Sequence, residues 1–276
     1  MTLKEAVELQ KEPLLQSLAE SIRIRSVQEP PADGAPYGPN VRKCLDHALA
    51  VSKGLGFRTT DLDHQMGWCE FGEGDEMIAV LGHLDVVPEG EGWTFDPFGG
   101  EIRDGKIFGR GSMDDKGPTM AALYAMAALR DSDLPLKRRI RILFGTNEET
   151  GSNDMKYYKS HGGELPVMGF TPDGEYPVIN GEKGIINVNY EADYTQIGDV
   201  RLTKISGGSA PNVVPASARA EITCPDDMKP QLMVLAAGCD RITCTETADG
   251  FEILATGVSA HGASPELGIN AIGLLM

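Results

Sequence analysis

Apolar strand-like runs that lead into possible metal ligands are the feature that most restricts the fold of this sequence. The run 139–144, which contains IRILF between basic flanks, predicts a buried strand. Runs 77–81 and 167–170 predict two more strands. Helical patterns alternate with these strands at residues 4–23, 41–54 and 118–131. Alternating helices and apolar strands indicate an α/β layered fold.

The pattern changes after about residue 184. Half-exposed strands are predicted at 185–190, 202–206, 218–223, 241–245 and 251–255, and a helix near 226–238. These elements indicate a second, smaller α+β domain. We therefore predict an α/β domain over residues 1–184 and a second domain over residues 185–276.

Composition restricts the partners and the compartment. The net charge of −16 makes nucleic acid a poor partner, because an acidic surface repels phosphate. The five cysteines form no CxxC pair, which favours reduced thiols. The N-terminal residues lack the pattern of a signal peptide, and no apolar run approaches the ~18 residues of a membrane span. These features predict a cytoplasmic location and no membrane partner.

Four predicted elements end in residue types that bind metals. MIAVLG leads into His83 and Asp85, KIFGRGSM into Asp114 and Asp115, RIRILFGTN into Glu148 and Glu149, and VMGFTP into Asp173. In α/β sheets, ligands bind outside the carboxyl ends of the strands. We therefore expect these side chains to meet at one edge of the sheet.

Each group taken alone has an ordinary explanation. A strand-end histidine can be structural, paired aspartates can cap a helix, adjacent glutamates can be solvated, and an aspartate can simply occupy a turn. All four groups fall at the same topological position, however, and this favours a common site. A carboxylate-rich site with one imidazole suits zinc, or less selectively cobalt or manganese.

The spacing of these residues suggests a division of roles. Of two adjacent carboxylates, one can bind a metal while the other remains a general base. Asp114 could bridge two ions ~3.5–4 Å apart, as in two-metal aminopeptidase sites. Asp85 lies two residues after His83, so it can hydrogen-bond the second imidazole nitrogen and fix the tautomer.

Four ordered motifs resemble the co-catalytic zinc peptidases of metallopeptidase family M twenty. The motifs are GHLDVVPEGEGW, GRGSMDDKGP, GTNEETGS and FTPDGEYP. The form DDKGP is similar to that of PepV-type and carnosinase-like dipeptidases. The resemblance implies a zinc-exopeptidase-like mixed sheet with helices on both faces, a lid domain, and hydrolysis of a short peptide.

The resemblance also implies residue roles. His83 and Asp173 would bind one zinc ion, Asp114 would bridge both ions, and Glu149 would bind the second. Asp85 would orient His83, and Glu148 would be the catalytic base. The peptide bond between residues 114 and 115 is expected to be cis. In the lid, His261 would stabilise the oxyanion and Asn212 would lie near the substrate.

The last residues predict a helix that opens at Ser264 and Pro265 and ends on apolar side chains. We interpret this end as a truncation. The resemblance implies one further zinc-ligand histidine beyond it, so the second zinc site would lack a ligand and both domains would be incomplete. Self-association through the incomplete lid is then a possible partner interaction.

Two alternatives to a dipeptidase remain open at this point. The same site could act on another amide, as in N-acyl amino acid deacylases and desuccinylases. The chain could also be a catalytically incompetent metal-binding fragment.

Overall fold

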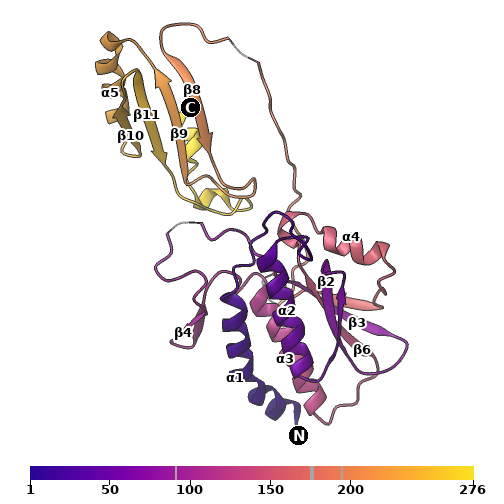
Figure 1. The fold of residues 1–276 in the computed structure, drawn as a ribbon. Helices are drawn as coiled ribbons and strands as arrows, with labels where there is room; N and C mark the ends of the chain where they lie inside the picture. Colours follow the sequence, from indigo (N-terminus) through magenta and orange to yellow (C-terminus); the bar gives the residue numbers. More distant parts are fainter. Residues whose placement is uncertain (91, 175–176, 194) are drawn as a thin grey trace. The chain divides into compact units, whose positions relative to one another are not determined.

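The computed structural model describes residues 1–90, 92–174, 177–193 and 195–276. It divides into two compact units, which we call unit 1, Met1–Ile179, and unit 2, Asn180–Met276. The two units are coloured along the sequence in Figure 1 and are described here one at a time. The domain boundary predicted from the sequence lies slightly later, between residues 184 and 185.

Unit 1 is built on a five-stranded mixed sheet with the strand order β1-β2-β6-β3-β7 (Figure 1). Its strands are β1 (Arg58–Leu62), β2 (Met66–Phe71), β3 (Met77–His83), β6 (Arg139–Gly145) and β7 (Met168–Phe170). β3 runs parallel to both β6 and β7, whereas β2 runs antiparallel to β6 and to β1. A separate hairpin joins β4 (Glu101–Arg103) to β5 (Lys106–Phe108).

Four helices cover the sheet of unit 1. They are α1 (Leu3–Ile22), α2 (Pro39–Gly54), α3 (Lys116–Asp131) and α4 (Asn153–Ser160). α1 begins with a capping box, in which the Thr2 side chain accepts from the Glu5 amide and the Glu5 side chain accepts from Thr2. α2 begins with a proline, which suits a first helical position.

Alternate residues of the central strands β2, β3 and β6 pack into two separate apolar clusters. On β6, Ile142 and Phe144 join the larger cluster with residues of α1, α2 and α3. Leu143 points the other way and joins a smaller cluster with Tyr158 of α4. Because successive strand residues face opposite sides of a sheet, helices cover both faces. The predicted fold class is confirmed.

The parallel register brings several strand ends together. His83, the last residue of β3, is paired with Gly145, the last residue of β6. On its other side, β3 pairs with β7 up to Phe170. The residues that follow β3, β6 and β7 therefore leave the sheet at the same edge.

Unit 2 contains a four-stranded antiparallel sheet with the order β10-β11-β9-β8. Its strands are β8 (Arg201–Gly207), β9 (Ser217–Thr223), β10 (Ile242–Glu246) and β11 (Gly250–Thr256), and its helices are α5 (Lys229–Ala237) and α6 (Ala271–Leu275). Ala218, Ala255 and Ala271 form its buried centre. Among the helices of the described residues, none combines the length and apolar character that a membrane span needs.

Two local predictions were wrong. The strand predicted over 185–190 forms no strand within the described residues, and Ile185 and Ile186 are 87% and 86% exposed. The pattern of apolar residues there favours a strand, but pairing also requires a neighbouring strand. The helix predicted from Ser264 is a 3-10 turn, Pro265–Leu267, which Gly268 ends. α6 begins later, after Asn270, whose side chain caps it.

Candidate metal centre

His83 occupies the centre of the candidate site, at the end of β3. Its side chain is 3% exposed. Nδ1 lies 2.9 Å from the carbonyl oxygen of Asp85. A carbonyl oxygen can only accept, so Nδ1 carries a proton, and Nε2 is the ring nitrogen that can hold a second proton or bind a metal ion. The backbone amide of His83 also donates to Asp115, at 3.1 Å.

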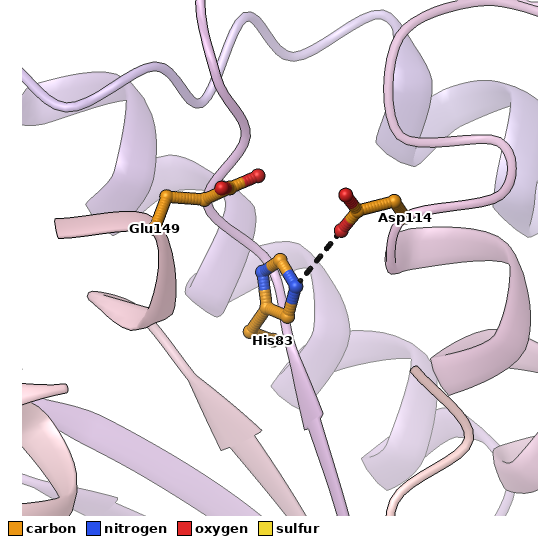
Figure 2. A group of neighbouring side chains, drawn as sticks. All are labelled: His83, Asp114 and Glu149. Atoms are coloured by element: carbon orange, nitrogen blue, oxygen red, sulfur yellow. Dashed lines mark ion pairs between the residues drawn. The ribbon is translucent and has the colours of Figure 1, made fainter. Parts of the chain in front are cut away.

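Carboxylates surround Nε2 of His83. Its distances are 3.1 Å to Asp114 Oδ1, 3.4 Å to Asp173 Oδ2 and 3.9 Å to Glu148 Oε2. Glu149 and Asp114 place ligand atoms within 4.8 Å of His83 and of each other, and Glu148 and Asp173 form a second such group with His83. Figure 2 shows the Glu149 and Asp114 carboxylates on either side of the imidazole. We call these five residues the His83 cluster.

The pKa shifts in the His83 cluster reflect burial and crowding of negative charge. Burial raises the pKa of Glu149 to about 7, and the nearby Asp114 adds to this shift. Burial also raises the pKa of Glu148. Burial lowers the pKa of His83, but the adjacent carboxylates of Asp114 and Asp173 outweigh it, and the pKa is raised overall. The cluster therefore favours a positive charge at the position that Nε2 faces.

The donor set fits a bound metal cation. Among the described residues, the buried Nε2 of His83 has no hydrogen-bond partner of normal geometry. A ring nitrogen that faces carboxylate oxygens is unfavourable unless a proton or a metal cation lies between them. One imidazole with several carboxylates is a donor set that zinc accepts, and manganese and cobalt accept similar sets.

The turn that carries Glu148 and Glu149 is held from several sides. The two glutamates open a 3-10 turn, Glu148–Thr150, directly after β6. Their backbone amides donate to the two carboxylate oxygens of Asp85 at 3.2 and 3.1 Å. Oε1 of Glu149 also accepts from the backbone amide of Val87, at 3.2 Å. Asp85 thus contacts His83 mainly through its carbonyl oxygen, and its carboxylate supports the turn.

Asp114 reaches the cluster from the loop before α3. The peptide bond between Asp114 and Asp115 is cis, as predicted. The next residue, Lys116, is fully buried, and its Nζ donates to the carbonyl oxygens of Ser21 and Ile24 at 2.8 Å each. Burial lowers the pKa of this lysine. Its bonds tie the start of α3 to the end of α1.

The two remaining candidate residues meet inside unit 2. Val213, beside Asn212, forms an antiparallel bridge with His261. The amide of Gly262 donates to the carbonyl oxygen of Asn212, at 2.6 Å. Both candidate side chains are exposed, and an open groove of about 610 Å³ is lined by residues next to them, including Pro211 and Gly262. The structure thus brings together two residues from distant parts of the sequence.

Fold and site together define unit 1 as an α/β domain with a carboxylate–imidazole metal centre at the carboxyl edge of its sheet. The model of Peptidase family M20/M25/M40 matches residues 79–243, more than half of the chain. The chain therefore belongs to this peptidase family. The matched segment includes every candidate site residue except His261.

Curated relatives agree with this assignment. The chain is 40% identical over 279 residues to "Putative dipeptidase YtjP" of Bacillus subtilis, with 96% of the chain and 59% of the relative covered. It is 37% identical over 288 residues to "Beta-Ala-Xaa dipeptidase" of Lactobacillus delbrueckii subsp. lactis, with 100% of the chain and 60% of the relative covered. The chain spans about 60% of the length of these relatives.

A solved structure shares the fold. The crystal structure of human carnosine dipeptidase 1 matches with a TM-score of 0.50 and 23% identity. The match covers 63% of this chain and 41% of the other.

Proposed function

We propose that the protein hydrolyses short peptides in a zinc-dependent reaction, with dipeptides as its main substrates. The observation that carries this proposal is the buried Nε2 of His83, which faces the carboxylates of Asp114, Asp173 and Glu148. Family membership and the dipeptidase names of the curated relatives support the reaction and the substrate class.

We assign the metal ligands as follows. His83 and Asp173 would hold one ion, Glu149 would hold a second, and Asp114 would contribute to holding both. Zinc, or manganese or cobalt in its place, would lower the pKa of water and polarise the peptide carbonyl group. The geometric support is that His83, Asp114 and Glu149 form one ligand-sized group and that Asp173 joins His83 in another.

Glu148 is our candidate for the general base. Its carboxylate accepts a proton from the attacking water and then gives it to the leaving amine. Its half-buried position raises its pKa, which makes the carboxylate a better proton acceptor. In unit 2, His261 would stabilise the oxyanion and Asn212 would contact the substrate, and their closeness within that unit supports a joint role. A well-placed oxyanion donor contributes ~3–4 kcal/mol.

A substrate panel tests the proposal. The metal-depleted protein is supplied with zinc and assayed against α-dipeptides, β-alanyl dipeptides, and N-acetyl and N-succinyl amino acids. We expect the dipeptides to be cleaved at least about tenfold faster than the acylated amino acids. Faster cleavage of the acylated amino acids would assign a deacylase instead. Zinc binding without cleavage of any compound would indicate a catalytically incompetent fragment.

The remaining proposals concern the cellular location of the protein and its self-association. We propose a cytoplasmic location, which the five cysteines support because none of them is in a disulfide. Self-association through unit 2 is a further proposal, supported by exposed apolar side chains such as Val234 and Leu235 of α5. Gel filtration at two protein concentrations tests it.

A further inference from the structure

Four consecutive backbone amides lead from β6 into the His83 cluster, and each of them donates to a buried carboxylate. The amides of Thr146 and Asn147 lie 2.6 and 3.2 Å from Oδ2 of Asp154. The next two amides bind the two oxygens of Asp85. The path of residues 146–149 is therefore set by two carboxylates, one from the loop after β3 and one from α4.

Asp154 lies directly behind the strand ends that carry the cluster. It is 1% exposed. A Cβ atom added to Gly145 would meet Oδ2 of Asp154 at 3.1 Å and the Cβ of His83 at 3.2 Å. The carboxylate thus fits into space that exists because residue 145 is glycine, at the point where β3 and β6 end side by side.

The bonds of Asp154 point mostly away from its own helix. Within α4, Oδ1 accepts only from the amide of Met155, at 2.7 Å. The N-cap residue of α4, Ser152, makes no side-chain capping bond. An acidic residue in a first helical turn stabilises that helix in any case. The two bonds to residues 146 and 147 are additional to this effect, and they act on the segment that presents Glu148 and Glu149.

We propose that Asp154 is a positioning residue, which together with Asp85 fixes residues 146–149 and so directs Glu148 and Glu149 toward His83. This inference rests on the proposed function for the roles of the two glutamates. Charge-assisted hydrogen bonds from backbone amides to a buried carboxylate are strong and directional. Residues that hold metal ligands in place in this way typically change metal affinity about 10- to 100-fold when they are removed.

The test compares Asp154→Ala and Asp154→Asn with Leu45→Ala in the whole protein. Leu45 is fully buried in α2 and belongs to the larger apolar cluster, so its truncation lowers stability without removing a bond to residues 146–149. Hydrogen exchange of the amides of residues 146–149 is measured at neutral pH. Zinc alone is then titrated calorimetrically into each metal-depleted variant, and kcat and KM are measured with a dipeptide.

We expect Asp154→Ala to speed exchange of the four amides at least about tenfold and to weaken zinc binding about 10- to 100-fold. The kcat value should fall more than KM rises. Leu45→Ala should lower the melting temperature but leave the zinc affinity, kcat and KM unchanged. Asp154→Asn, which retains one acceptor oxygen, should lie between Asp154→Ala and the wild type, and it provides the measurement if the alanine variant does not fold.

The inference would be overturned if the Asp154 variants kept the amide exchange rates and the zinc affinity of the wild type. It would also be overturned if Leu45→Ala lost as much zinc affinity as Asp154→Ala. A wild-type protein that cleaves no dipeptide would count against the proposed function. The exchange and zinc measurements would still decide the role of Asp154 in that case.

Discussion

His83 and Asp85 meet through a main-chain acceptor, with Nδ1 of His83 2.9 Å from the carbonyl oxygen of Asp85 and 3.4 Å from its carboxylate. The backbone of residue 85 therefore fixes the imidazole tautomer. The carboxylate of Asp85 is left to bind the amides of Glu148 and Glu149. The sequence analysis expected the Asp85 side chain to contact the imidazole, whereas the shorter contact comes from the backbone.

Replacing Asp85 by alanine separates these roles experimentally. The carbonyl oxygen remains, so we expect Nδ1 of His83 to stay protonated, as long-range proton–nitrogen NMR can show. Losing the acceptor for two partly buried amides should cost about 1–3 kcal/mol of unfolding free energy. Zinc affinity should fall about 10- to 100-fold as the turn loosens.

Asp85→Asn is the matched control. It keeps one acceptor oxygen, so its free energy of unfolding and its zinc affinity should fall less than those of Asp85→Ala. A shift of the His83 proton to Nε2 in Asp85→Ala would contradict the main-chain assignment.

The adjacent glutamates should respond differently to the same substitution. Glu148→Gln removes the proposed base, so we expect kcat to fall at least about a thousandfold while zinc affinity stays within a few-fold of wild type. Glu149→Gln removes a proposed ligand, so zinc affinity itself should fall at least tenfold. Calorimetry and dipeptide assays on the two variants provide the comparison. Retained turnover in Glu148→Gln would refute the assignment, as would an equal loss of zinc affinity in Glu148→Gln and Glu149→Gln.

A buried ion-pair group away from the site predicts a pH effect on stability. Glu70 of β2 accepts from Arg58 at 3.0 Å, from Arg139 at 3.0 Å and from Arg141 at 2.9 Å. Burial raises the pKa of Glu70, but the bonds to Arg58 and Arg141 outweigh it, and the pKa is lowered below its ordinary value of 4.5. The stabilisation is therefore complete above pH 4.5 and is lost as the pH falls through the lowered value.

Glu70→Gln tests this effect by urea unfolding at pH 7 and at pH 3. We expect the variant to be less stable than wild type by about 2 kcal/mol at pH 7, because charged hydrogen bonds are lost. The difference should be smaller at pH 3, because the stabilisation declines once the pH lies below 4.5 and falls toward the lowered pKa of Glu70. A difference that is constant or larger at pH 3 would contradict the lowered pKa.

Much of the fold and the composition of the site followed from the sequence. Hydrophobic periodicity located β3, β6 and β7, and the rule for parallel strand ends placed His83, Glu149 and Asp173 at one edge, where the structure also brings Asp114. Their individual roles remain predictions. The cis peptide bond between residues 114 and 115 followed from the family resemblance and is confirmed.

Other features depend on contacts that local patterns do not contain. Asp154 was missed because an acidic residue in a first helical turn has an ordinary explanation, and only the folded chain shows its bonds to residues 146 and 147. Lys116 was missed because its acceptors lie in α1. The strand predicted at 185–190 failed for a similar reason, since pairing is a long-range property.

Zinc titration of the metal-depleted protein tests whether the His83 cluster is the metal centre of a peptidase. The comparison uses wild type, His83→Ala and the exposed-histidine control His161→Ala. We expect wild type and His161→Ala to bind zinc equally and to regain dipeptide hydrolysis with it, while His83→Ala binds zinc at least about 100-fold more weakly and stays inactive. Wild-type zinc affinity in His83→Ala, or hydrolysis that persists without metal, would contradict this assignment of the metal centre.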